Sequence, residues 1–134
     1  MKKIVNNIIP FEGFIAMTIW PFIFVRKGMA PKFDDVAENH ENIHGEQQKE
    51  MLGVGILLGG IVSMITACAW WLLLFVPVFF WWYLIEYCLR SIFGTGNAYR
   101  KILFEQEAYS NERDFDYLKN RRPFAWLCPP SKKA

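Results

Sequence analysis

The residues best suited to chemistry lie in the stretch NHENIH, where the chain's only two histidines have the spacing H-E-x-x-H. His40 and His44 are four positions apart, so on a helix they share one face and both imidazoles can bind a single tetrahedral zinc ion. Glu41 lies beside them, where metallohydrolases carry the carboxylate that takes a proton from the zinc-bound water. The spacing predicts a zinc site with its general base. The alternative is a pair of ordinary histidines on a charged helix.

A catalytic zinc site needs a third protein ligand, and no third histidine exists. The remaining candidates are carboxylates in the later stretch FEQEAYSNE, where Glu105 and Glu107 follow His44 by 61 and 63 residues. Glu105, Tyr109 and Glu112 fall on one helical stripe, at i, i+4 and i+7. Glu105 is therefore the predicted third ligand, with Tyr109 and Glu112 as partners of the ligands or of the transition state. Glu107 is the alternative ligand.

The apolar and aromatic residues, at 53% and 17% of the chain, are concentrated in one block. No side chain from Met51 to Ile85 is charged, over 35 residues. Since one crossing takes about 20 apolar residues, the block suffices for two short transmembrane helices. We therefore expect an integral membrane protein with the lipid bilayer as a partner. Basic residues before and after the block favour two cytoplasmic termini, and the net charge of +2 gives no reason to expect a nucleic-acid partner.

The expected fold is mainly α-helical and forms a single membrane-embedded domain over residues 1–134. One helix is expected to begin at Asp34–Asp35, carry the H-E-x-x-H stretch and continue into the membrane. The preceding segment indicates a β-hairpin with its turn near Trp20–Pro21, or a re-entrant or interfacial segment. The predicted segments are the apolar hairpin or interfacial segment 8–25, the motif helix and transmembrane hairpin 34–93, the amphipathic helix 98–120 and the tail 121–134.

Several other side chains have structural explanations. The polar residues after the motif are predicted to form a solvated helix face, namely Glu46, Gln47, Gln48, Lys49 and Glu50. The glycines that follow would give a smooth surface for close helix packing in lipid, namely Gly53, Gly55, Gly59 and Gly60. Glu86 and Arg90, four positions apart, are predicted to form an ion pair. The three cysteines, with no metal or disulfide spacing, are expected to be small buried hydrophobes.

The motif pair NHENIH and FEQEAYSNE resembles the paired motifs of gluzincin-type metallopeptidases, above all the membrane-embedded CAAX-type prenyl protease and HtpX-like group. In that group the second motif is E-x-x-A-D and its first Glu is a zinc ligand, so the resemblance implies this role for Glu105. Tyr109 stands where the motif has Asp. The contact that Asp makes to a zinc-bound histidine is then expected from Asn111 or Glu112.

Three stretches together are similar to a family of small bacterial membrane proteins: PFEGF, NHENIH with two glutamines after it, and YRKILFEQEAYSNE. This resemblance covers about residues 10 to 120. It implies an integral protein of the bacterial inner membrane and no particular activity.

Two functions are expected from these observations. In the first, the chain is a minimal membrane zinc metallopeptidase with Glu41 as general base, and Tyr99, Tyr109 or Arg100 stabilises the oxyanion. Its substrate is a membrane-associated peptide or protein segment, which a strand of the N-terminal hairpin could pair with. In the second, the chain is a non-enzymatic subunit of a larger membrane complex, and its polar helices form a docking surface or a structural metal site. The metallopeptidase is the favoured function, and the small size of the chain is the argument for the subunit.

Overall fold

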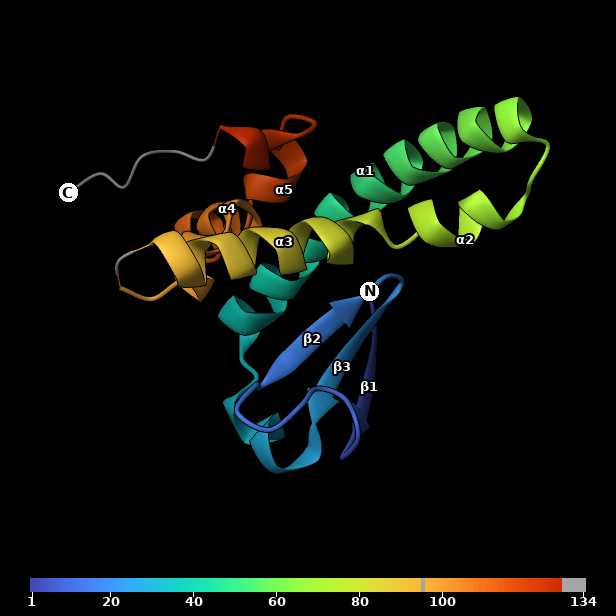
Figure 1. Cartoon of the computed structure of the whole chain (residues 1–134). Helices are drawn as coiled ribbons and strands as arrows, with labels where there is room; N and C mark the ends of the chain where they lie inside the picture. The colour runs from blue at the N-terminus through green and yellow to red at the C-terminus, as the bar shows by residue number, and fades with distance from the viewer. Residues whose placement is uncertain (95, 129–134) are drawn as a thin grey trace.

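The computed structural model describes residues 1–94 and 96–128, and these form a mainly helical protein with a small sheet at the N-terminus (Figure 1). The strands are β1 (Lys2–Asn6), β2 (Ala16–Ile19) and β3 (Phe22–Arg26). The helices are α1 (Asp35–Thr66), α2 (Trp70–Phe75), α3 (Val78–Phe93), α4 (Leu103–Asn111) and α5 (Tyr117–Asn120). Short 3-10 helices span Lys27–Lys32, Tyr99–Lys101 and Ala125–Leu127.

The predicted β-hairpin is confirmed: β2 and β3 pair antiparallel and turn at Trp20–Pro21. The sequence did not indicate β1, which pairs in parallel with β3 and gives the strand order β1-β3-β2. Alternate residues of a strand share one face. On the face toward α1, Thr18, Ile23 and Val25 are buried. The sheet is therefore one wall of the polar half of α1, and β2 is an edge strand.

Helix α1 begins where the acidic residues predicted. The side chain of Asp34 caps its first turn by accepting a hydrogen bond from the Ala37 amide at 2.8 Å. Its 32 residues correspond to a length of about 48 Å. The half before Met51 is packed between the sheet and α4, whereas the half after it exposes large apolar side chains, such as Leu57 and Met64 at 64% and 84%. A core helix would bury these side chains.

The prediction of two transmembrane helices is wrong, because the described residues contain one candidate membrane-spanning helix and not two. Within residues 1–94 and 96–128, α1 is the only helix that is long and apolar enough to cross a membrane. The second apolar stretch is divided into α2, with 6 residues, and α3, with 16. The division falls at Val76–Pro77 because proline has no amide hydrogen and its ring clashes with the preceding turn.

Two of the four glycines in α1 provide the close packing that the sequence indicated. A side chain at Gly55 would collide with the backbone carbonyl of Phe75, and one at Gly59 would lie 3.0 Å from the Phe75 Cβ atom. Gly53 and Gly60 face open space, so they take no part in the packing of α1 against α2. Helix α2 thus runs back along the apolar half of α1, and the two form a hairpin (Figure 1).

The predicted amphipathic helix 98–120 is broken into the 3-10 helix Tyr99–Lys101, α4 and α5. Asp114 supplies one reason, because its carboxylate accepts a hydrogen bond from the Asp116 amide at 3.0 Å and stabilises a turn instead of a helix. The predicted tail is in part a packed segment, since Trp126 is buried against Phe104. Residues 129–134 of that tail lie outside the described residues.

A buried apolar cluster holds α4 against the start of the hairpin. Its members are Met51, Phe79, Ile102, Phe104 and Trp126. The cluster lies at the junction of the polar and apolar halves of α1. It therefore fixes α4 beside the part of α1 that carries the two histidines.

Candidate metal centre

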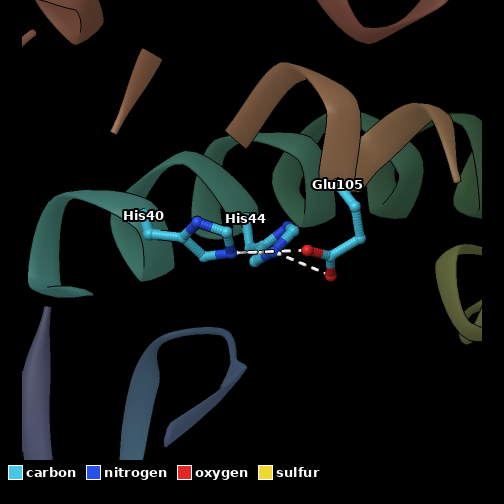
Figure 2. Close-up of side chains that lie close together, drawn as sticks. All are labelled: His40, His44 and Glu105. Atoms are coloured by element: carbon cyan, nitrogen blue, oxygen red, sulfur yellow. Dashed lines mark hydrogen bonds and ion pairs between the residues drawn. The ribbon is translucent and has the colours of Figure 1, made fainter. Parts of the chain in front are cut away.

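His40, His44 and Glu105 come together where α4 packs on α1, as Figure 2 shows. The Nε2 atoms of the two imidazoles lie 3.1 Å apart. The Glu105 carboxylate lies 3.4 Å from Nε2 of His40 and 3.3 Å from Nε2 of His44. All three residues are buried, with exposed fractions of 8%, 7% and 2%. This group could hold a metal ion, and it is the set of residues that the two sequence motifs predicted as ligands.

The outer ring nitrogen of His40 is held by Glu112. Nδ1 of His40 lies 2.9 Å from Oε2 of Glu112, and an ionised carboxylate only accepts hydrogen bonds. The proton of a neutral His40 is therefore on Nδ1, which leaves a lone pair on Nε2. Of the two residues expected to contact a ligand histidine, Glu112 is the one that does so. Asn111 does not, since its side-chain amide donates to the Glu107 carbonyl.

The outer ring nitrogen of His44 is held by Gln47 at 2.8 Å. The amide nitrogen of Gln47 donates to the Phe104 carbonyl and to the Glu107 carboxylate, both at 3.0 Å. Both of those partners are acceptors, so the side-chain oxygen of Gln47 is the atom that faces His44. It accepts the Nδ1 proton of His44. Burial alone would lower the pKa of His44, but Glu105, Glu41 and Gln47 outweigh it and raise that pKa to about 9, so Nε2 of this ring carries a proton where no metal ion displaces it.

A metal ion bound between the two Nε2 atoms, which lie 3.1 Å apart, would displace the Nε2 proton of His44 and take a lone pair from each imidazole. Oε2 of Glu105 adds a buried oxygen with no hydrogen-bond partner among the described residues. Burial alone would raise the pKa of Glu105, but the neighbouring imidazoles of His44 and His40 outweigh it and hold that pKa well below its ordinary value. The carboxylate is therefore ionised. Two imidazole nitrogens and one carboxylate are a donor set found in catalytic zinc sites, so these residues fit that metal.

Glu41 is held toward the sheet. Its Oε2 accepts a hydrogen bond from the Thr18 hydroxyl of β2 at 2.7 Å, and the residue is only 9% exposed. Glu41 and His44 both line a cavity of about 630 Å³. The predicted general base therefore lies in the same cavity as two of the three predicted ligands.

The three residues predicted to stabilise an oxyanion take different positions. Tyr99 lines the cavity, and burial together with the charge of Glu105 raises the pKa of its hydroxyl, so the hydroxyl is a donor at neutral pH. Tyr109 lies outside the cavity lining, with its ring 4.7 Å from that of His40. Arg100 stacks on the Tyr109 ring at 4.8 Å. Of the three, Tyr99 is the one placed toward the cavity.

The cavity is lined by both charged and apolar side chains. Glu41, His44 and Glu105 supply its charged side chains, and Phe14 of the loop before β2 also lines the cavity. The apolar wall comes from one face of α3, namely Phe79, Phe80, Tyr83, Leu84 and Tyr87. A volume of about 630 Å³ falls in the range of small-molecule and peptide pockets.

Sequence reasoning missed three residues at the site. Gln47 and Gln48 were predicted on a solvated face, but they are 0% and 8% exposed. The hydroxyl of Tyr83, in the aromatic block, donates to Oε1 of Glu105 at 3.0 Å. The spacing could have identified Gln47, because it follows His44 by three positions and His40 by seven and so shares their helix face.

Glu107, the alternative ligand, belongs to a separate buried ion-pair cluster. Its carboxylate accepts hydrogen bonds from Arg121 at 2.6 Å and from the Tyr117 hydroxyl at 2.9 Å. Arg121 also donates to Glu50 at 2.5 Å, so Glu50 is not on a solvated face either. Burial opposes the charge of Arg121, but its hydrogen bonds to Glu50 and Glu107 raise its pKa above the ordinary value.

Two further sequence predictions have definite outcomes. The Glu86–Arg90 ion pair is confirmed at 2.5 Å, and Glu86 also accepts a hydrogen bond from the Leu103 amide. The expectation of buried cysteines is wrong for Cys88 and Cys128, which are exposed.

Comparisons of the chain with protein-family models, with curated proteins and with solved structures find no match.

Proposed function

We propose that the chain is a membrane-embedded zinc metallopeptidase that hydrolyses a peptide bond in a membrane-associated peptide or protein segment. The observation that carries the proposal is the convergence of two buried Nε2 atoms, 3.1 Å apart, with the buried carboxylate of Glu105 at 3.3 and 3.4 Å from them. Two imidazoles and a carboxylate are a donor set of catalytic zinc sites, and bound zinc would replace the proton of His44.

Zinc bound by His40, His44 and Glu105 would polarise the scissile carbonyl and lower the pKa of a bound water. Glu41 takes the proton from the attacking water and later gives it to the leaving amine. Tyr99 donates a hydrogen bond to the oxygen that develops negative charge. Thr18 orients Glu41 through the hydrogen bond to its carboxylate.

The proposed location in a membrane rests on the exposed apolar half of α1 and on the α2 segment packed along it. His44 lies about two helical turns, and His40 about three, before the boundary at Met51. The apolar wall of the cavity belongs to α3, whose other faces expose large side chains such as Leu89 and Phe93. A substrate segment that is itself associated with the membrane could reach the cavity along this apolar surface.

The first experiment is elemental analysis of the protein purified in detergent. We expect about one zinc ion per chain, lost in the His40→Ala/His44→Ala variant and strongly reduced in Glu105→Gln. Glu46→Gln is the matched control, since Glu46 lies on the same helix and forms a surface ion pair with Lys49. No zinc in the wild-type protein, even after loading at neutral pH, would contradict the proposal.

Glu41→Gln separates an enzyme from a structural metal protein. We expect the variant to keep its zinc and to lose peptide hydrolysis, because the amide cannot accept the water proton. If Glu41→Gln changes nothing and the solubilised protein copurifies with a much larger membrane complex, the subunit function replaces the peptidase.

A further inference from the structure

The open edge of β2 faces the candidate metal centre. Arg26 N donates to the Ile15 carbonyl at 3.0 Å, so Ile15 and Arg26 form a hydrogen-bonded pair of the β2–β3 ladder. Such pairs alternate along an antiparallel ladder. The backbone groups of Ala16, Thr18 and Trp20 therefore point away from β3, toward the open edge.

One end of this edge is already occupied by a side chain. The amide nitrogen of Gln48 donates to the Thr18 carbonyl at 2.7 Å, and its oxygen accepts a hydrogen bond from the Trp20 amide at 2.8 Å. A residue of a parallel neighbouring strand would make the same two bonds, to residues i and i+2. Gln48 thus substitutes for a peptide at this position of β2.

Three groups of the edge are left for a ligand. The N–H and C=O of Ala16 and the N–H of Thr18 have no hydrogen-bond partner in the described part of the chain. Ala16 and Thr18 line the same cavity as Glu41 and His44. An extended peptide in the cavity could pair with these three groups while the aromatic face of α3 lies opposite.

We propose that Gln48 determines substrate specificity by ending the pairing between β2 and the substrate. This inference rests on the proposed peptidase function. The substrate class is a short extended segment, held by β2 over Ala16 to Thr18 and carrying a large apolar side chain toward Phe79 and Phe80. A longer extended chain has to leave β2 after Thr18, because Gln48 occupies the Thr18 carbonyl and the Trp20 amide.

Displacement of Gln48 by the substrate is opposed by the structure around it. The residue is 8% exposed and belongs to the rigid polar half of α1, so a displaced side chain would leave a buried amide without partners. The hydroxyl of Thr18 contacts both the backbone carbonyl and the carboxylate of Glu41, which ties β2 to α1 at this residue. Strand and helix are therefore fixed relative to each other at this position.

The test measures binding of hydroxamates to zinc-loaded protein in detergent. Acetohydroxamate probes the metal alone. Phenylalanine-containing peptides of one, three and five residues, with the hydroxamate at the C-terminus in one series and at the N-terminus in another, extend from the metal in both directions. For wild type we expect affinity to rise by about fivefold or more from one residue to three and to change little from three to five, in the series that runs along β2.

Two variants test the assignment, and both must keep the wild-type zinc content. In Gln48→Ala the five-residue peptide should bind about fivefold tighter than the three-residue peptide, because the freed Thr18 and Trp20 groups then pair with it. Ala16→Pro removes an outward N–H without touching the β2–β3 ladder. It should weaken the three-residue peptide and leave acetohydroxamate binding unchanged.

The outcomes separate this inference from the proposed function. If zinc-loaded wild type binds no acetohydroxamate, the metallopeptidase site itself is wrong and the inference falls with it. If acetohydroxamate binds but the length profile is the same in wild type and Gln48→Ala, or if Ala16→Pro weakens no peptide, Gln48 does not limit pairing on β2 and only the inference is overturned.

Discussion

Each candidate ligand histidine is oriented by a different chemical group. A carboxylate, Glu112, holds His40, whereas the neutral amide of Gln47 holds His44. An amide can present either end, so its direction has to be set by other residues. Here the Phe104 carbonyl and the Glu107 carboxylate both accept from the amide nitrogen, which turns the oxygen toward His44. Loss of such a partner of a metal-binding histidine typically lowers metal affinity by about 10–100-fold.

Gln47→Ala should therefore weaken zinc binding by about 10–100-fold while the site remains assembled. The expected cause is loss of the Nδ1 acceptor, which frees the His44 ring to rotate and to carry its proton on Nε2. Competition with a chromophoric chelator measures the affinity, and the visible spectrum of the cobalt-loaded protein reports the ligand geometry. Glu46→Ala is the control one position away. Equal zinc affinity in both variants would show that Gln47 does not orient His44.

Arg121 is the buried cation on which the second cluster depends. Its side chain is 5% exposed and that of Glu107 is 0% exposed. Arg121→Met should lower the free energy of unfolding by about 3–5 kcal/mol, because it leaves two carboxylates buried without their cation. Lys119→Met is the matched control: its ion pair with Asp116 is exposed and is expected to contribute about 0–1 kcal/mol. Denaturant unfolding in detergent measures both, and similar losses in the two variants would contradict the assignment.

At the residue scale, the candidate ligands could be predicted because their spacing on a helix is a local property of the sequence. His40 with His44, and Glu105 with Glu112, each follow from helical periodicity. Gln47 was wrongly predicted to face solvent because its burial is not a local property of the sequence. Its burial depends on α4, which lies 57 residues further along the chain at Phe104 and is brought there by tertiary packing. Tyr83 was missed because nothing in an aromatic block distinguishes a hydroxyl that contacts a carboxylate from one that faces lipid.

At the element scale, the hairpin of α1 and α2 depends on two of its glycines. Gly55→Ala should separate the two helices and lower thermal stability in detergent, because the new methyl group meets the backbone of Phe75, which cannot move without shifting α2. Gly53→Ala is the matched control: it faces open space, so alanine should be neutral or slightly stabilising. If the two variants unfold at the same temperature, α2 does not pack on α1 at this position.

The elements themselves were predictable where the signal is local. Asp34 marks the start of α1, and the apolar alternation before Trp20–Pro21 marks the hairpin of β2 and β3. Strand β1 escaped prediction because it pairs in parallel with a strand 20 residues away, at Lys2 opposite Phe22. Pro77 is the local signal for the division of the second apolar stretch. Hydropathy alone nevertheless counts a second crossing, because it sums the residues on both sides of Pro77.

At the scale of the whole molecule, both ends of the chain gather around the polar half of α1. Lys3 of β1 pairs with Glu38 at 2.6 Å, and Arg121 near the other end pairs with Glu50. The α1–α2 hairpin extends away from this assembly in Figure 1. Tryptophans lie at both ends of this hairpin. Trp70 and Trp71 are near its tip, and Trp82 packs against Trp126 at its base. Tryptophans at both ends of an apolar segment suit the two interfaces of a bilayer.

The tip of the hairpin gives the last prediction. From Met51 to Thr66, 16 residues at about 1.5 Å each span about 24 Å, slightly less than a hydrocarbon core of about 30 Å that can thin around a short helix. Cys68 at the tip should therefore react with a membrane-impermeant maleimide from the face opposite to the one that labels Cys128. Single-cysteine variants in vesicles of both orientations measure this. Labelling of both residues from the same face would mean that the hairpin does not cross, and the site would then belong to a protein embedded in one leaflet.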